Sequence, residues 1–238
     1  MIHYRLFQLR LLTQLPLLVA EANQLRRHDP KLPARSSRIV LGEGEKHVLL
    51  LGESTVAGLG ASSTDTTLAG NFHRLLGADF SIETVGKTGM RAKGMHDWYL
   101  QNRQEPPAKT TGIFIFLGAN DCFKLTSPTE YREHLGQLLN SLQTTSCPDW
   151  IYLADIPPVH LFPAFSEKMC YYLERQRAYL RLEMERLAEQ RSNLIFHPLN
   201  LPLQPDFFSE DLVHPSDKGY QKIAEVAFAE LSNRAVFS

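Results

Sequence analysis

Three residues of this chain are of the types that together perform nucleophilic catalysis. Ser54 follows the apolar run LLLG and precedes a stretch of small residues. Far along the chain, Asp211 and His214 stand three residues apart in the segment DLVHPSDKGY. In a tight loop this spacing lets the carboxylate reach one ring nitrogen of the histidine, and the other nitrogen can then take a proton from a serine hydroxyl. The pattern predicts Ser54 as nucleophile, His214 as its base and Asp211 as the group that orients the base.

Such a nucleophile needs hydrogen-bond donors aimed at the negative oxygen that develops on the substrate. Three donors are available: the backbone N–H of Ser54, the backbone N–H of Gly89 and the side-chain amide of Asn120. A glycine at position 89 has no Cβ, so a substrate can approach its backbone closely. These groups predict an oxyanion hole.

The elements that must position these residues alternate between strand and helix. Five apolar, β-branched or aromatic runs predict strands at 47–52, 80–86, 112–118, 150–155 and 194–199, each followed by a helical pattern. The alternation predicts an α/β fold with three layers, α/β/α, around a flavodoxin-like parallel five-stranded sheet. Ligands bind at the carboxyl ends of the strands in such sheets. The candidate residues follow strands or precede the last helix, so we expect them at this one edge.

The 238 residues fit one α/β domain, which we expect at 39–238, after an N-terminal helical segment and linker at 1–38. The apolar stretch at 11–20 is interrupted by Gln14 and Pro16 and is too short to span a bilayer as a helix. Two interpretations stay open. The segment is an amphipathic helix that packs on the domain or makes peripheral contact with a membrane surface, or it is a weak signal peptide.

Composition limits the partners and the compartment. Hydrophobic residues make up 43% of the chain and charged residues 21%, which allows a full core. The net charge of -1 gives no bulk attraction to nucleic acid. The three cysteines have neither a metal-binding nor a disulfide spacing, which favours a reducing compartment. We therefore expect a cytoplasmic protein that acts on a small molecule, with the signal peptide or membrane-surface helix left open and no indication of oligomeric state.

Four short blocks, in their order along the chain, resemble the SGNH hydrolase superfamily, also called the GDSL-type esterases and lipases. The matching residues are Gly52-Glu53-Ser54 with Gly58, then Gly89, then Gly118 with Asn120 and Asp121, then Asp211, His214 and Pro215. The resemblance runs from about residue 48 to the last predicted helix. The chain departs from the family pattern at Glu53, where the family usually has aspartate, and at Thr84, where an asparagine is often found.

The resemblance implies hydrolysis of a carboxylic ester through an acyl-enzyme. In that scheme Ser54 attacks the acyl carbon, His214 acts first as base and then as acid, and Asp211 fixes the tautomer of the imidazole. Ser54, Gly89 and Asn120 would hold the oxyanion. Neither a metal nor an organic cofactor is implied. Because the residue at position 53 is not a reacting group, we expect Glu53 to change local packing and to leave catalysis intact.

Apolar side chains near the predicted site suggest an acyl pocket. Met90, Phe123 and Val213 are the candidate lining residues, and the Pro-rich, aromatic segment 155–165 predicts a loop over the site. This supply of apolar groups suits a short- to medium-chain acyl group better than a polyhydroxylated sugar. Three alternatives stay open: a thioesterase, a carbohydrate O-deacetylase on the same scaffold, and a non-catalytic flavodoxin-like module that only binds a ligand.

Overall fold

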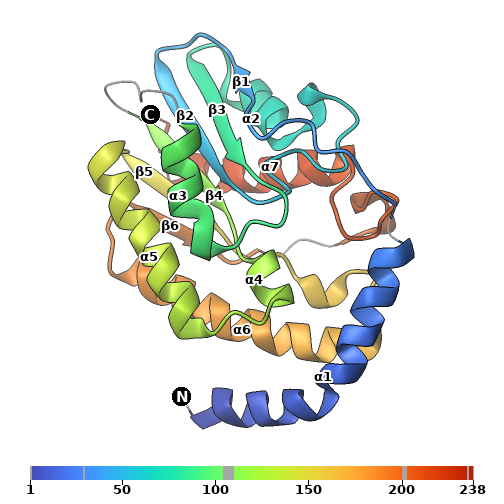
Figure 1. Cartoon of the computed structure of the whole chain (residues 1–238). Coiled ribbons are helices and arrows are strands. Elements are labelled where there is room, and N and C mark those ends of the chain that lie inside the picture. Colours follow the sequence, from blue (N-terminus) through green and yellow to red (C-terminus); the bar gives the residue numbers. More distant parts are fainter. Residues whose placement is uncertain (1, 29, 104–109, 200–202, 235, 238) are drawn as a thin grey trace.

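A six-stranded sheet forms the centre of the molecule (Figure 1). The structure is a computed structural model that describes residues 2–28, 30–103, 110–199, 203–234 and 236–237. The strands lie in the order β1-β3-β2-β4-β5-β6. Their bounds are β1 Val40–Leu41, β2 Lys46–Gly52, β3 Phe80–Gly86, β4 Gly112–Phe116, β5 Trp150–Ala154 and β6 Leu194–His197.

The five predicted strands are all present and pair in parallel. Counted among themselves, they lie in the order 2-1-3-4-5, which is that of flavodoxin-like folds, so the predicted fold class is confirmed. The sheet is nevertheless mixed, because the sequence analysis missed β1, which pairs antiparallel with β3. A two-residue strand is too short to have a periodicity of its own. It forms because Ile39 exchanges hydrogen bonds with Thr84 beside it.

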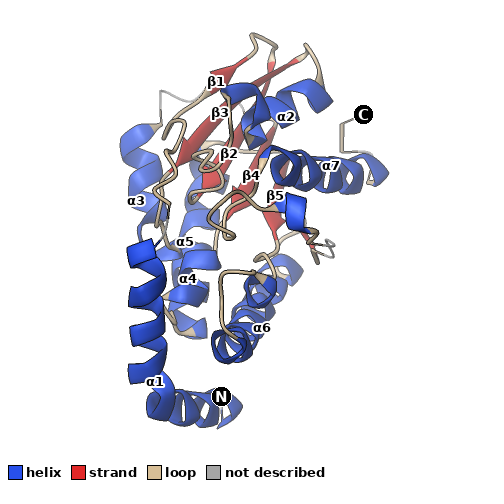
Figure 2. Ribbon diagram, turned by 90° about the vertical axis from the view of Figure 1, so that its right-hand side faces the viewer, coloured by secondary structure: helices blue, strands red, loops and turns tan. Residues whose placement is uncertain are grey.

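Helices cover both faces of the sheet and give the three predicted layers (Figure 2). One face packs against α2 and α7, and the other packs against α3, α5 and α6. The short α4 follows β4. The bounds are α2 Leu68–Leu76, α3 Ala92–Asn102, α4 Ala119–Phe123, α5 Pro128–Thr145, α6 Glu167–Glu189 and α7 Asp217–Asn233.

The near-continuous apolar run of β2 follows from its central place in the sheet. Val48 and Leu50 point to the layer of α2 and α7, whereas Leu49 and Leu51 point to the layer of α3, α5 and α6. All four side chains are buried. Successive side chains of a strand face opposite sides, so a strand that is covered on both sides needs apolar residues at every position.

The N-terminal helix α1 (Ile2–His28) lies outside these layers and packs on α6 (Figures 1 and 2). Phe7 and Leu11 are buried, and Phe7 contacts the ring of Tyr179 on α6. The Ser166 hydroxyl, at the start of α6, donates a 2.7 Å hydrogen bond to Glu21. Among the helices that the structure describes, none combines the length and apolarity needed to cross a bilayer. The domain boundary at 38/39 stays a prediction.

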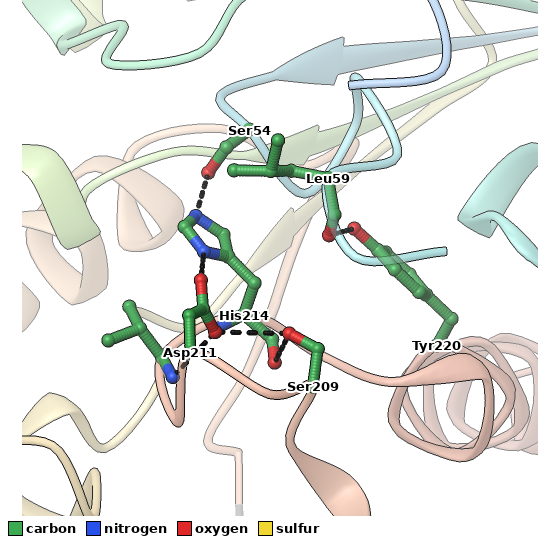
Figure 3. A network of polar contacts seen from close by, with 7 residues as sticks. Ser54, Leu59, Ser209, Asp211, His214 and Tyr220 are labelled. Carbon is green, nitrogen blue, oxygen red and sulfur yellow. Dashed lines mark hydrogen bonds and ion pairs between the residues drawn. The ribbon is translucent and has the colours of Figure 1, made fainter. Parts of the chain in front are cut away.

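Helix α7 is fastened to the loop that follows β2. The buried Tyr220 hydroxyl donates a 2.7 Å hydrogen bond to the carbonyl of Leu59 (Figure 3). At the first turn of α7, the Asp217 carboxylate accepts hydrogen bonds from the N–H and the hydroxyl of Ser62. These contacts fix the segment before α7, which carries His214, against the loop that carries Ser54.

Replacing Tyr220 by phenylalanine removes this hydroxyl and leaves the buried Leu59 carbonyl without its donor. We expect Tyr220→Phe to lower the free energy of unfolding by about 1–3 kcal/mol, measured by urea denaturation. Tyr171→Phe is the matched control, because the Tyr171 side chain is exposed and its hydroxyl has no hydrogen-bond partner among the described residues. Equal effects of the two substitutions would contradict this account of the α7 attachment.

Candidate functional site

Ser54 stands in the turn that follows β2 at the carboxyl edge of the sheet. The turn is closed by hydrogen bonds from the N–H of Val56 to the Glu53 carbonyl and from the N–H of Leu59 to the Ser54 carbonyl. Gly52, the last residue of β2, is needed for close packing, since a Cβ there would lie 2.3 Å from the carbonyl oxygen of Phe116. The turn thus displays the serine next to the end of β4, the neighbouring strand.

A continuous chain of hydrogen bonds joins the three residues that the sequence singled out (Figure 3). The Nε2 atom of His214 lies 3.1 Å from Ser54 Oγ, and its Nδ1 atom lies 2.5 Å from Asp211 Oδ2. When Nδ1 carries the hydrogen that it shares with Asp211, Nε2 is left as an acceptor for the serine hydroxyl. This is the geometry in which an imidazole can take the serine proton.

The Asp211 carboxylate is held by donors from its own loop. Its Oδ1 atom accepts hydrogen bonds from the N–H groups of Val213 and His214, and from the hydroxyl of Ser209. Leu212 makes this compact loop possible by adopting φ = +57°, a left-handed conformation that is strained for leucine. Burial alone would raise the pKa of Asp211, but hydrogen bonds from the side chain and backbone of His214 lower it to about 2. The carboxylate is therefore ionised at neutral pH and can stabilise an imidazolium.

Two residues that are predicted to supply backbone N–H groups to the oxyanion hole lie beside a cavity at this edge. Ser54 and Gly89 both line it, and neither of their N–H groups donates to another backbone group in the described part of the chain. Gly89 has φ = +75°, so a side chain there would be strained. Gly86, the other glycine of this segment, has a packing role, because a Cβ there would lie 2.6 Å from the Ala57 nitrogen. The geometry thus favours Gly89 as the donor.

Asn120, the third predicted donor, is held by Glu53. The two carboxylate oxygens of Glu53 accept 3.0 Å hydrogen bonds from the N–H groups of Ala119 and Asn120. The side-chain amide of Asn120 donates one hydrogen to the same carboxylate. An asparagine amide has two hydrogens, so the second remains available for a ligand in the cavity.

Glu53 is a buried carboxylate with a perturbed pKa. Its side chain is almost fully buried, and this burial raises its pKa to about 7, although the donors from Asn120 and Ala119 oppose the shift. Three N–H groups converge on its two oxygens, and such donors stabilise the ionised form of a carboxyl group. The orientation of Asn120 is therefore coupled to a group that titrates near neutral pH.

A cavity of about 890 Å³ opens beside Ser54 and His214. Phe123 and Val213, two of the predicted pocket residues, line it. Met90 does not line this cavity. It is buried in the core, and it borders a second, smaller cavity of about 340 Å³ together with Lys87 and Trp98. The Met90 side chain belongs to the core cluster that also contains Met95 and Tyr99 of α3.

The predicted loop over the site, residues 155–165, lines the large cavity with several of its apolar residues. They are Pro157, Pro158, Phe162, Pro163, Ala164 and Phe165. The sequence analysis missed the wall from α1, to which Ala22, Leu25 and His28 contribute. The sequence analysis also missed the contact of Glu53 with Asn120. The available signal was the position of Glu53 directly before Ser54 in the Gly-Glu-Ser block.

Comparisons with known proteins match the chain to one family model and to solved structures. The model of the GDSL-like Lipase/Acylhydrolase family matches residues 50–222. No curated protein matches the chain in sequence.

Solved structures share the fold at low sequence identity. A family two carbohydrate esterase from Clostridium thermocellum, solved with cellohexaose, is 16% identical over 83% of this chain and 67% of its own, with a TM-score of 0.61. An aryl esterase from M. smegmatis is 15% identical over 79% of this chain and 99% of its own, with a TM-score of 0.59. A member of the lipolytic protein G-D-S-L family from Veillonella parvula is 15% identical over 79% of this chain and 99% of its own, with a TM-score of 0.61.

The lowered pKa of Asp211 predicts a pH-dependent contribution to stability. A carboxyl group whose pKa is lower in the folded than in the unfolded state stabilises the fold above its unfolded value, here 3.8. That contribution disappears as the pH falls towards about 2. Urea denaturation should therefore give Asp211→Asn a deficit of about 1–2 kcal/mol against wild type at neutral pH, narrowing below about pH 4. If the free energy of unfolding of Asp211→Asn stays below that of wild type by a constant amount as the pH falls towards about 2, the linkage is contradicted.

Glu53 predicts a pH-dependent effect on catalysis rather than on binding. A glutamine side chain at this position would offer one acceptor oxygen where the carboxylate offers two, so in Glu53→Gln the Asn120 amide loses its fixed orientation. We expect kcat for ester hydrolysis to fall by about 10–100-fold with a smaller change in KM, within the loss of about 10²–10³ for removing one oxyanion donor. Because wild-type Glu53 itself becomes protonated below about pH 7, the deficit should be largest above that pH and shrink below it.

The ratio of wild-type to variant kcat/KM between mildly acidic and mildly alkaline pH measures this effect. Asn120→Ala removes the donor itself and therefore gives the largest loss of activity that Glu53→Gln can cause. Glu133→Gln is the matched control, because Glu133 is exposed on α5. Circular dichroism spectra must first establish that Glu53→Gln folds. A deficit that does not vary with pH would show that Glu53 serves the fold and leaves Asn120 unaffected.

Proposed function

Because the chain belongs to the GDSL-like lipase/acylhydrolase family and is a carboxylic ester hydrolase, we propose that it acts through Ser54, His214 and Asp211 on esters with short- to medium-chain acyl groups. The observation that carries the proposal is the unbroken contact from Ser54 Oγ through the imidazole to Asp211. Nucleophile, base and orienting carboxylate stand within hydrogen-bond reach of one another, as covalent catalysis by serine requires.

Acylation begins when the Ser54 oxygen attacks the ester carbonyl carbon. His214 Nε2 takes the serine proton as the new C–O bond forms, and Asp211 stabilises the resulting imidazolium. The carbonyl oxygen becomes negative and is held by the N–H groups of Ser54 and Gly89 and by the free amide hydrogen of Asn120. When the tetrahedral intermediate collapses, the ester bond breaks and His214 returns the proton to the leaving alcohol.

Deacylation repeats the same steps with water as the nucleophile. His214 takes a proton from the water molecule that attacks the Ser54 ester, and then gives the proton back to Ser54 Oγ as the acid leaves. The groups of the oxyanion hole hold the second tetrahedral intermediate. The enzyme is thus restored with one ester and one water converted to one acid and one alcohol.

The shape and chemistry of the large cavity support an apolar acyl group. Its volume of about 890 Å³ is in the range of small-molecule sites and is large enough for an acyl chain together with part of the alcohol. Its walls include Phe123, Phe162, Phe165 and Val213, and the aromatic rings of Phe162 and Phe165 stack on each other. Along these four side chains an alkyl chain makes apolar contact, whereas the hydroxyl groups of a sugar would find no hydrogen-bond partner among them.

A series of p-nitrophenyl esters from acetyl to dodecanoyl tests the proposal. We expect wild type to hydrolyse them with a maximum of kcat/KM at short to medium chain length. Ser54→Ala should lose about 10⁴–10⁶ in kcat. Ser141→Ala is the matched control, because Ser141 lies on α5, does not line the large cavity, and has a hydroxyl with no hydrogen-bond partner among the described residues.

The outcomes separate the proposal from its alternatives. Activity of Ser54→Ala equal to that of wild type would remove Ser54 from the mechanism. Wild type that is inert on the esters but active on an acyl thioester or an acetylated sugar would replace the proposed substrate class by that of a thioesterase or a carbohydrate O-deacetylase. Wild type that is inert on all three, and that binds the esters without turning them over, would favour the non-catalytic binding module.

A further inference from the structure

Helix α1 carries apolar side chains on the face that points away from the protein. Its inward face buries Phe7 and Leu11 against α6. On its outward face five large apolar side chains are between 48% and 62% exposed: Leu6, Leu9, Leu12, Leu17 and Val19. A helix that is apolar on both sides is usually covered on both sides. The outward face therefore needs an occupant.

The charges of α1 favour an anionic occupant. Arg5, Arg10, Arg26 and Arg27 are exposed, and none of them forms an ion pair within the part of the chain that the structure describes. The one acidic residue of α1, Glu21, already accepts a hydrogen bond from Ser166. Long arginine side chains can lie along an apolar surface and place their charges among anionic headgroups. A symmetric second copy would instead bring arginines of like charge together.

The same helix forms part of the wall of the large cavity. Ala22, Leu25 and His28, in its C-terminal half, line the cavity with Ser54 and His214. Figures 1 and 2 show that α1 changes direction along its length, and the helix contains Pro16, a residue type that commonly bends helices. The exposed leucines Leu6, Leu9 and Leu12 lie in the N-terminal half of α1, and Leu17 lies just beyond it. One helix thus joins an uncovered apolar face to the wall of the candidate active site.

We propose that α1 lies flat on the surface of an anionic lipid bilayer, with its outward leucines among the acyl chains and its arginines among the headgroups. The helix then holds the cavity at the bilayer surface, where apolar esters concentrate. This inference rests on the exposed face and charges of α1, and it holds whether or not Ser54 is the nucleophile.

Co-sedimentation of the full chain with lipid vesicles tests the proposal. One set of vesicles contains equal parts of phosphatidylcholine and phosphatidylglycerol, and the other contains phosphatidylcholine alone. We expect wild type to bind the anionic vesicles, with weaker binding at high salt and on the neutral vesicles. Leu9→Ser with Leu12→Ser should lower the partition coefficient by roughly tenfold or more. Arg5→Gln with Arg10→Gln should reduce the preference for anionic vesicles.

Leu100→Ser with Leu182→Ser is the matched control, because both leucines are large, exposed and outside α1. Hydrolysis of a water-soluble p-nitrophenyl ester by Leu9→Ser with Leu12→Ser should equal that of wild type, which shows that the variant is folded. Vesicle binding by Ser54→Ala should also equal that of wild type, so a failure of the proposed catalysis does not affect this test.

Three results would overturn the proposal. The first is an absence of wild-type binding to anionic vesicles. The second is an equal loss of binding in the α1 variant and in its matched control. The third is a wild-type dimer in analytical ultracentrifugation that Leu9→Ser with Leu12→Ser converts to a monomer, because this would assign the apolar face to a second copy of the chain.

Discussion

The contact between Ser54 Oγ and His214 Nε2 is the interaction that the sheet and the start of α7 together hold in place. It joins two segments that are 160 positions apart in the sequence. The first segment is held by the end of β2 in the centre of the sheet, and the second by the start of α7. The hydrogen bond from Tyr220 to Leu59 fixes these two supports together. A small shift of α7 would separate the base from the nucleophile even if every side chain were present.

Two carboxylates serve the site in opposite ways, and their environments explain the difference. Asp211 accepts hydrogen bonds from its own loop and from His214, which lower its pKa and keep it charged beside the imidazole. Glu53 is buried more deeply, and this burial raises its pKa, while its oxygens hold Asn120. In the proposed mechanism one carboxylate therefore orients the base, whereas the other orients a donor of the oxyanion hole.

The sequence predicted the parts of the site that depend on residue type and strand order, and it missed the parts that depend on side-chain reach. Ser54, Gly89 and Asn120 were predictable because each follows a parallel strand, and such strand ends meet at one edge. The contact of Glu53 with Asn120 depends on the length of one side chain. Met90 was misplaced because sequence cannot tell which way a side chain leaves a loop. The α1 wall was missed because tertiary packing alone brings residues 22–28 to the site.

Covalent labelling of the nucleophile tests the central claim most directly. The full chain would be treated with a fluorophosphonate, which reacts with an activated serine hydroxyl, and the adduct would be located by mass spectrometry of its peptides. The account predicts one adduct per chain, on Ser54, and strong suppression of labelling in His214→Ala, because the imidazole activates the hydroxyl. An adduct on another serine, or labelling that is independent of His214, would contradict it.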